Sequence, residues 1–345
     1  MKYGSALLFN RVCVMTKNIN SGLLISVGVG SVACLIASIV CLIASTNRGL
    51  KWTDVNYYTV WDNCFRMDDA KRLKEAIFYG LPINAFYDAD GNAAQCRGDE
   101  QVEPSRTLVL GALYSRATNC VEVLIGYNAD VSLVDARGNN ALMYASSLRG
   151  PTAIAYAEKL CKLHAFNINA SNSWSRTALC AAVGADNAMY AKWLIEHGAD
   201  YNALSANARK TAKRPVVFDA VNAGDDVYAL FVELPDVRFG AKDENGCGIV
   251  KWLNPKQRNY CDRFDFLAGK LNCLSDGGPR LGVIQYNMSM LGDCRDRVRF
   301  LCKYNWGESD LLAALKFAEA RGFTNCVQEL VAVLRASIDK STTSR

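Results

Sequence analysis

The sequence has 345 residues, of which 50% are apolar and 21% are charged, with a formal net charge of +5 at pH 7. A chain of this length holds one large domain or about two of ordinary size, and so high an apolar content excludes a largely disordered protein. The small positive surplus is spread over a long chain, so a nucleic-acid partner is not indicated.

The first predicted element is a membrane-spanning helix over residues 23–45, "LLISVGVGSVACLIASIVCLIAS", which contain no charged residue. As a helix this segment is about 34 Å long, enough to cross a hydrocarbon core of about 30 Å. A cleavable signal peptide has a shorter apolar core of about 7–15 residues. The sequence "GSVAC" at 30–34 faintly resembles a lipoprotein processing site, but the apolar run continues past Cys34. We therefore predict a retained signal anchor.

The charges beside this segment predict its orientation. Lys2, Arg11 and Lys17 precede it, whereas Arg48 and Lys51 are the nearest basic residues after it. This small excess favours a single-pass membrane protein whose body lies on the extracytoplasmic, periplasmic side. A start at Met15 would leave only Lys17 and the terminal amine ahead of the segment, which would weaken the bias.

A repeated pattern fills much of the remaining sequence. It appears as "GYNADVSLVDARGNNALMYAS" from Gly126, "HAFNINASNSWSRTALCAA" from His164 and "EHGADYNALSANARKTAKRPV" from Glu196. Each copy has a helix end, a turn, an extended stretch with a polar tip, and a new helix rich in small residues. The helix starts at Arg106, Asn139 and Arg176 are 33 and 37 residues apart. Tips of the form "DADG", "DARG" and "DENG" recur at 88, 135 and 243.

These residues resemble the ankyrin-repeat family, whose units of about 33 residues pair two helices with a projecting hairpin loop. "EHGADYNA" is similar to the family's helix end and hairpin, and "RTALCAA" to its first-helix start. The family's Thr-Pro-Leu-His tetrad is poorly kept, because "TALC" retains Thr177 and Leu179 while "NALM" retains only Leu142. The resemblance covers about residues 65–252. It implies an all-α ankyrin-repeat solenoid of helix–turn–helix units with hairpin loops, preceded here by one transmembrane helix.

The only two histidines, His164 and His197, both fall in the turns of this repeat. Gly198 follows the second, at a position where a helix ends in a left-handed residue, and Asn128 takes the corresponding place one copy earlier. We therefore predict that both histidines are structural.

The predicted organisation follows from these elements. Beyond Trp252 the repeat register fades, and the final segment "SDLLAALKFAEARGFTNCVQELVAVLRAS" resembles a helix pair that closes a stack, with Gly322 between its halves. The expected divisions are a short N-terminal segment (1–22), the transmembrane helix (23–45), a linker and N-terminal cap (46–65), ankyrin repeats (66–252), divergent helical repeats with a C-terminal cap (253–340) and a flexible tail (341–345).

No metal, cofactor or catalytic site is predicted. The fourteen cysteines include no CxxC and no tight cluster with histidine, so zinc is not indicated. Most lie in apolar patterns that favour buried thiols, although an oxidising compartment would permit one or two disulfides. Asp88, Asp90, Asn92 and Asp99 have calcium-loop spacing, but Ala93 replaces the required glycine. The pair Asp225-Asp226 is expected at a helix start, where acidic residues are favoured by the helix dipole.

The resemblance implies that the hairpin tips and the concave face formed by the first helices bind a partner protein. Aromatic and arginine residues dominate the energy of such interfaces. The candidate partner-binding residues are Phe86, Tyr87, Arg137, Trp174, Arg176, Lys242 and Glu244. For Trp174, packing against a neighbouring tip is an equal alternative.

Two basic clusters are less distinctive. Arg209, Lys210, Lys213 and Arg214 lie on a predicted loop, and Arg295, Arg299 and Lys303 share one helical face. Each could bind an acidic partner or lipid headgroups, although a solvated surface explains both.

The sequence therefore predicts a non-catalytic, membrane-tethered protein that binds and scaffolds or inhibits another protein, with no small-molecule substrate. A sharper version is an immunity protein that neutralises a secreted toxin. Two alternatives stay open: an effector that acts on a host-cell protein, and an enzyme hidden in the irregular region 253–309.

Overall fold

A computed structural model of the chain describes residues 60–87, 93–94, 106–205, 213–271, 282–304 and 306–343. They belong to one compact unit, Val55–Arg345, which is distinct from a second unit, Met1–Asp54. The predicted transmembrane segment 23–45 lies outside the described residues, as do the N-terminal segment 1–22 and the calcium-like residues Asp88, Asp90, Asn92 and Asp99. Within the described ranges, no helix has the length and apolarity needed to span a membrane.

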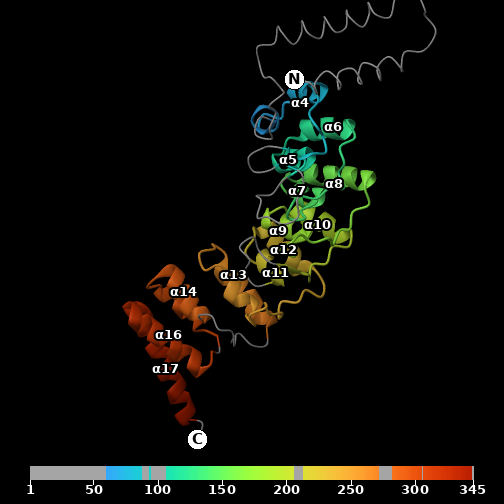
Figure 1. The fold of residues 1–345 in the computed structure, drawn as a ribbon. Helices are drawn as coiled ribbons and strands as arrows, with labels where there is room; N and C mark the ends of the chain where they lie inside the picture. The colour runs from blue at the N-terminus through green and yellow to red at the C-terminus, as the bar shows by residue number, and fades with distance from the viewer. Residues whose placement is uncertain are drawn as a thin grey trace, which may run out of the picture. The chain divides into compact units, whose positions relative to one another are not determined.

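The described chain is a succession of helix pairs joined by short turns (Figure 1). Each pair has a first helix and a second helix. The pairs, in chain order, are η2 (Trp61–Phe65, a π-helix) and α4 (Ala70–Phe78); α5 (Leu108–Tyr114) and α6 (Thr118–Gly126); α7 (Ala141–Ala145) and α8 (Pro151–Leu163); α9 (Ala178–Gly184) and α10 (Ala188–Glu196); α11 (Val217–Ala220) and α12 (Asp225–Glu233); η3 (Ile249–Trp252, a 3-10 helix) and α13 (Tyr260–Lys270); α14 (Val283–Leu291) and α15 (Arg295–Leu301); and α16 (Glu308–Arg321) and α17 (Thr324–Thr343).

Two hairpins between pairs contain short antiparallel strands. Strand β1 (Phe86–Tyr87) pairs with β2 (Ala93–Ala94), and β3 (Leu204–Ser205) pairs with β4 (Arg214–Pro215). Each strand has only two residues, so the expectation of a mainly helical fold with hairpin loops is confirmed.

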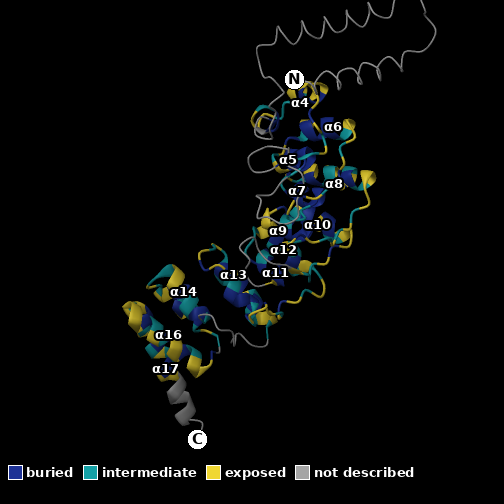
Figure 2. Cartoon of the chain, in the orientation of Figure 1, coloured by how far each residue is buried: buried dark blue, intermediate teal, exposed yellow. Residues whose placement is uncertain are grey.

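The first helices stack on one another and form the centre of the core. Helix α5 contacts α7, α7 contacts α9, and α9 contacts α11. All five residues of α7 are buried, whereas α10 buries only one face, including Tyr190 and Leu194. Figure 2 shows the same contrast in its burial colours. Small residues such as Ala145 and Ala182, both without exposed surface, allow the stacked first helices to approach closely.

Side-chain caps fix where the first helices begin. Thr107, Asn140 and Thr177 precede α5, α7 and α9, and each side-chain oxygen accepts a hydrogen bond from the backbone N–H three residues later. Such caps satisfy a backbone donor that the helix itself leaves unpaired. The predicted helix starts in this part of the chain are thereby confirmed.

Aspartates in the turns within helix pairs join successive units. Asp68, at φ 51°, accepts hydrogen bonds from the backbone of Asn119 and Cys120 at 3.1 and 2.9 Å. Asp186, at φ 55°, accepts one from Gly224 N at 2.7 Å. Each side chain therefore caps the second helix of the following pair.

The same arrangement recurs beyond the predicted ankyrin register. Asp293 accepts hydrogen bonds from the backbone of Asn325 and Cys326, at 3.1 and 2.9 Å, at the start of α17. Helix α14 contacts α16, and α15 contacts α17. Gly322, at φ 68°, ends α16 in the left-handed conformation that a glycine adopts without strain. The final helix pair is thus present, whereas helix α14 was not foreseen from the sequence.

Helix α13 connects the predicted ankyrin repeats to the helix pairs that follow them. Arg263 donates to the carbonyl oxygens of Val221 and Ala223 at 2.9 and 2.7 Å and forms an ion pair with Asp225. On its other side, Tyr260 OH accepts a hydrogen bond from Asn287 Nδ2 of α14 at 2.9 Å. Paired helices therefore continue past residue 252.

The histidines and the described cysteines have structural surroundings. The ring of His197 stacks on Trp193 at 3.9 Å, and His164 meets Phe166 edge to face at 4.7 Å. Every cysteine in the described ranges is a free thiol, and five are buried. Burial raises the pKa of the Cys64 thiol to about 11 and raises that of Cys120 further. These thiols are packed rather than reactive.

Candidate protein-binding surface

Three hairpin tips are built around one buried polar side chain each. The Oδ1 atom of Asp135 accepts hydrogen bonds from the backbone of Arg137 and Asn139, at 2.9 and 2.7 Å. Asn172 binds the backbone of Trp174 and Arg176 in the same way, at 2.9 Å each. Asp243 repeats the pattern in its own tip, where it accepts hydrogen bonds from the backbone of Asn245 and Cys247. Because these carbonyl and carboxylate oxygens are buried, they hold each tip in one conformation.

Neighbouring tips are also bonded to each other. Ser173 N donates to Arg137 O at 2.8 Å, and Asn172 Nδ2 donates to Asn139 Oδ1 at 2.7 Å. The guanidinium of Arg137 lies 4.7 Å from the centre of the Trp174 ring. Both side chains remain partly exposed. Trp174 therefore packs against the neighbouring tip and still presents part of its surface to solvent.

Two arginines that precede first helices, Arg106 and Arg176, form contacts with these helices. Arg176 Nη2 donates to Cys180 O of α9 at 3.3 Å. Arg106 Nε donates to Tyr144 OH at 2.8 Å, and its guanidinium lies 4.5 Å from the ring centre of Tyr114. Tyr114 is 47% exposed and was not recognised from the sequence. Its signal is its place at the end of a first helix, as the last residue of "LVLGALY".

These contacts form one connected surface. Tyr144 OH donates to Asp135 Oδ2 at 2.7 Å, which links Arg106 to the tip that carries Arg137. The tip contacts described above then continue to the next unit. We call the set Arg106, Tyr114, Arg137, Trp174 and Arg176 the arginine–aromatic surface.

The other predicted site residues lie elsewhere. The expectation that Tyr87 is presented to a partner is wrong, because only 2% of it is exposed and its OH donates to Pro82 O at 3.0 Å. Burial raises its pKa to about 12. Phe86 points away from Tyr87 along the strand and is half-buried. Lys242 and Glu244 are exposed on a more distant tip, and no contact joins them to the arginine–aromatic surface in the described ranges.

Arg214 corrects the interpretation of the first basic cluster. It is buried, forms an ion pair with Asp219 and stacks 4.2 Å from the centre of the Trp252 ring. Trp252 Nε1 donates to Asp243 Oδ2 at 3.0 Å. Arg214, Trp252 and Asp243 thus repeat the spacing of Arg106, Tyr144 and Asp135, since both aromatics follow their arginine by 38 residues and their aspartate by 9. Arg209 and Lys210 lie outside the described residues.

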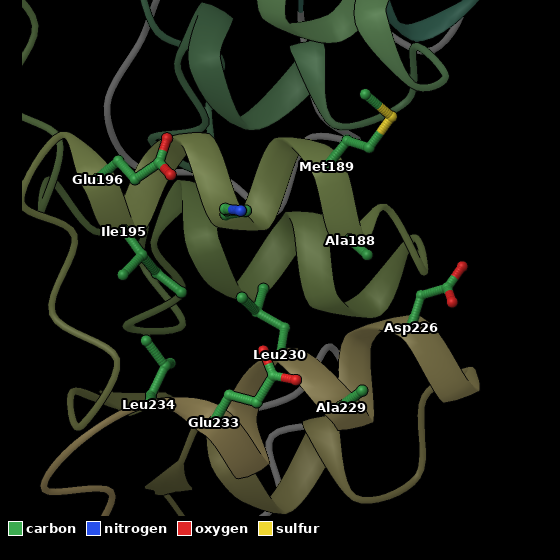
Figure 3. A pocket seen from close by; sticks show the side chains of 10 residues that line it. Ala188, Met189, Ile195, Glu196, Asp226, Ala229, Leu230, Glu233 and Leu234 are labelled. Carbon is green, nitrogen blue, oxygen red and sulfur yellow. The ribbon is translucent and has the colours of Figure 1, made fainter.

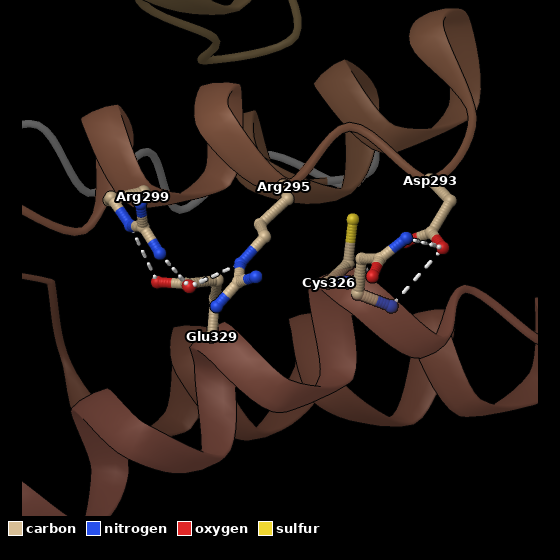
Figure 4. Close-up of polar contacts among 6 residues, drawn as sticks. Asp293, Arg295, Arg299, Cys326 and Glu329 are labelled. Carbon is tan, nitrogen blue, oxygen red and sulfur yellow. Dashed lines mark hydrogen bonds and ion pairs between the residues drawn. The ribbon is translucent and has the colours of Figure 1, made fainter.

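The second basic cluster has a structural role. Arg295 Nε donates to Glu329 Oε1 at 2.7 Å, and Arg299 Nε donates to Oε2 at 3.1 Å, which joins α15 to α17 (Figure 4). These guanidinium groups hold the pKa of Glu329 at about 2. Lys303 lies 5.6 Å from the centre of the Phe300 ring instead.

The described residues contain no group of three or more His, Cys, Asp or Glu side chains placed to hold a metal ion. Asp225, one of the two adjacent carboxylates at the start of α12, is paired with Arg263 and Asn259. Hydrogen bonds from both lower its pKa. This carboxylate is therefore occupied in joining α12 to α13.

Comparison with known proteins agrees with the geometry. Residues 103–212 match the family model described as ankyrin repeats, three copies, so this part of the chain consists of ankyrin repeats. Ankyrin repeats are protein–protein interaction modules. A solved ankyrin repeat domain from Acinetobacter baumannii AYE is 17% identical, covers 56% of this chain and 96% of its own, and has a TM-score of 0.42. No curated protein matches the sequence.

Proposed function

We propose that this chain is a non-catalytic, membrane-tethered protein that binds a partner protein on the arginine–aromatic surface. The observation that carries the proposal is the stack of Arg137 on Trp174, held by hydrogen bonds between two rigid tips. Arginine and tryptophan are the side chains that contribute most to protein interfaces.

The rigidity of the surface supports this role. Side chains whose backbone is already fixed lose little conformational freedom when a partner binds. The tips at Asp135 and Asn172 are fixed in this way, and Tyr114 is held against Arg106. The surface therefore combines exposed anchoring groups with a low entropic cost of binding.

The uncharged segment 23–45 and the basic residues before it support a single membrane anchor with the repeats on the periplasmic side. Tethering would keep the repeats beside the membrane, where they would scaffold or inhibit a partner. In its sharpest form the proposal is an immunity protein that neutralises a secreted toxin.

The binding proposal is tested by affinity purification of the full chain from its native membrane, followed by titration of the recovered partner. We expect Trp174→Ala with Arg137→Ala to weaken partner binding by at least about tenfold. The matched control is Tyr127→Ala, which removes another aromatic side chain that is 46% exposed but lies at the end of α6. Equal binding of the partner by the unaltered chain, the double variant and the control variant would contradict the proposed surface.

The tether is tested separately. We expect the full chain to resist alkaline extraction from membranes, and its repeats to be digested by protease added to the periplasmic side. Release by alkali, or protection of the repeats until the inner membrane is broken, would refute the anchor or its orientation without affecting the binding surface.

A further inference from the structure

A groove lies between the second helices α10 and α12, on the layer opposite to the stacked first helices. It has a volume of about 520 Å³ (Figure 3). Its lining comes entirely from these two helices and the residue after α12. It is thus separate from the arginine–aromatic surface, which is built from tips and first helices.

The groove has an apolar centre. Ile195 of α10 and Leu230 and Leu234 from the α12 side point toward one another across the gap (Figure 3). All three are partly exposed, and Met189, which is 50% exposed, lies at one end. An apolar furrow of this size is within the range of about 300–1,000 Å³ that is typical of ligand sites.

The rim of the groove is acidic. Its charged residues are Glu196, Asp226 and Glu233 with a single lysine, Lys192, which gives three negative charges against one positive charge. All four are exposed, and none forms an ion pair with another described residue. The adjoining pocket at the helix turns has two arginines, Arg116 and Arg149, against Asp186 and Asp226, so it is balanced. The negative surplus therefore belongs to the helical part of the groove.

We propose that this groove binds a basic amphipathic helix of a partner protein. Apolar residues spaced three and four apart would enter between Ile195, Leu230 and Leu234, and flanking lysines or arginines would meet Glu196 and Glu233. A helix of nine residues, the length of α10 and of α12, is about 13 Å long. That length accommodates two turns of a docked helix, whose side-chain ridges pack into the furrow between two helices.

The first test uses a defined probe. A fluorescein-labelled helical peptide of about 15 residues, with leucines on one face and lysines on the other, is titrated with the purified full chain, and fluorescence anisotropy is measured. We expect saturable binding that weakens as salt is raised, because exposed charges are screened. A peptide with glutamates in place of the lysines should bind at least about tenfold more weakly.

Charge-reversal variants identify the site. We expect the double variant Glu196→Lys with Glu233→Lys to bind the lysine peptide about tenfold or more weakly. We expect Lys192→Glu to bind it more tightly. Glu158→Lys is the matched control, because Glu158 is an exposed glutamate of α8 that does not line the groove. Circular dichroism verifies that each variant is folded. An equal loss with Glu158→Lys, or equal binding of the glutamate peptide, would overturn the proposal.

A second test identifies the natural occupant. A photoreactive amino acid at position 230 of the full chain is cross-linked in cells, and the linked peptide is sequenced. A basic amphipathic segment of another protein supports the proposal, provided that Glu196→Lys with Glu233→Lys abolishes the link. A link to a second copy, to this chain's own residues 1–59 or to an acidic segment overturns it. Trp174→Ala should leave this link unchanged, which separates the groove from the proposed function.

Discussion

The ankyrin repeats and the C-terminal helix pairs stack in the same way but are joined by different contacts. Between the repeats, buried polar groups at Asp135 and Asn172 connect one hairpin tip to the next. In the C-terminal pairs the distinguishing contact is made between the second helices, where Glu329 of α17 binds two arginines of α15 (Figure 4).

This difference shows that stacking and partner binding have separate requirements. The turn aspartates at Asp68, Asp186 and Asp293 join units in both regions. Rigid tips that present aromatic and arginine side chains occur in the ankyrin repeats, where the arginine–aromatic surface lies. The C-terminal pairs keep this turn aspartate, and the last pair has longer helices, with 14 residues in α16 and 20 in α17.

The largest expected effect tests the tip contacts of the ankyrin repeats. Asp135→Ala removes hydrogen bonds to Arg137 N, Asn139 N and Tyr144 OH from a buried site, so the local free energy of unfolding should fall by about 2–4 kcal/mol. Hydrogen-exchange mass spectrometry of the full chain measures this loss, which should be confined to the repeats and spare α16 and α17.

Two variants control this prediction. Asp135→Asn keeps an oxygen for the two backbone donors, as Asn172 does naturally, and should lose less stability. Asp130→Ala removes an exposed carboxylate that accepts hydrogen bonds from its neighbour Ser132, and it should change stability by less than about 0.5 kcal/mol. A loss spread evenly over repeats and C-terminal pairs would show that the two regions unfold as one cooperative unit.

An intermediate effect is expected at the turn aspartates, which cap the second helix of the following pair in both regions. Asp293→Ala removes the acceptor for Asn325 N and Cys326 N, so amides in the first turn of α17 should exchange roughly fivefold faster. Asp293→Asn should restore most of the protection because it keeps an acceptor oxygen. Asp296→Ala, in the exposed first turn of α15, is the control. If the Asn variant exchanges as fast as the Ala variant, charge rather than capping is responsible.

The smallest effect concerns pH and belongs to the C-terminal pairs alone. Arg299 and Arg295 lower the pKa of Glu329 to about 2, so its ionised form stabilises the fold above its unfolded pKa of about 4.3. This contribution is lost as pH falls from about 4.5 toward 2. In Glu329→Gln, protection of α15 and α17 should therefore depend less on pH in this interval. Identical pH profiles for the two proteins would contradict the stated role of the ion pairs.

Local signals were sufficient to predict the helices of the central repeats. Thr107 and Thr177 precede runs of small apolar residues and do cap helices there. The structural role of His197 followed from its place before Gly198, which is indeed in the left-handed region at φ 89°. Such features depend on neighbours in sequence, so they can be read without the fold.

Features set by distant partners could not be predicted in this way. Phe86 and Tyr87 are adjacent aromatics, yet a strand directs them to opposite faces, and only the packed unit decides which one is buried. The sequence places Arg214 in a basic cluster on a loop, whereas its partner Trp252 lies 38 residues later. Helix α14 was missed because its short apolar run between Gly282 and Gly292 does not keep the repeat spacing.

One hairpin loop can change in length because the residues at its two ends are bonded to each other. Tyr87 and Arg106 exchange backbone hydrogen bonds at 3.1 and 3.2 Å, and Asp68 joins the flanking units through Asn119 and Cys120 without using the residues between. Doubling the length of a loop costs only about 0.6 kcal/mol. The eleven residues between Ala94 and Arg106 could therefore be shortened, lengthened or replaced while the stack is preserved, so this hairpin is a natural insertion point for new recognition sequences.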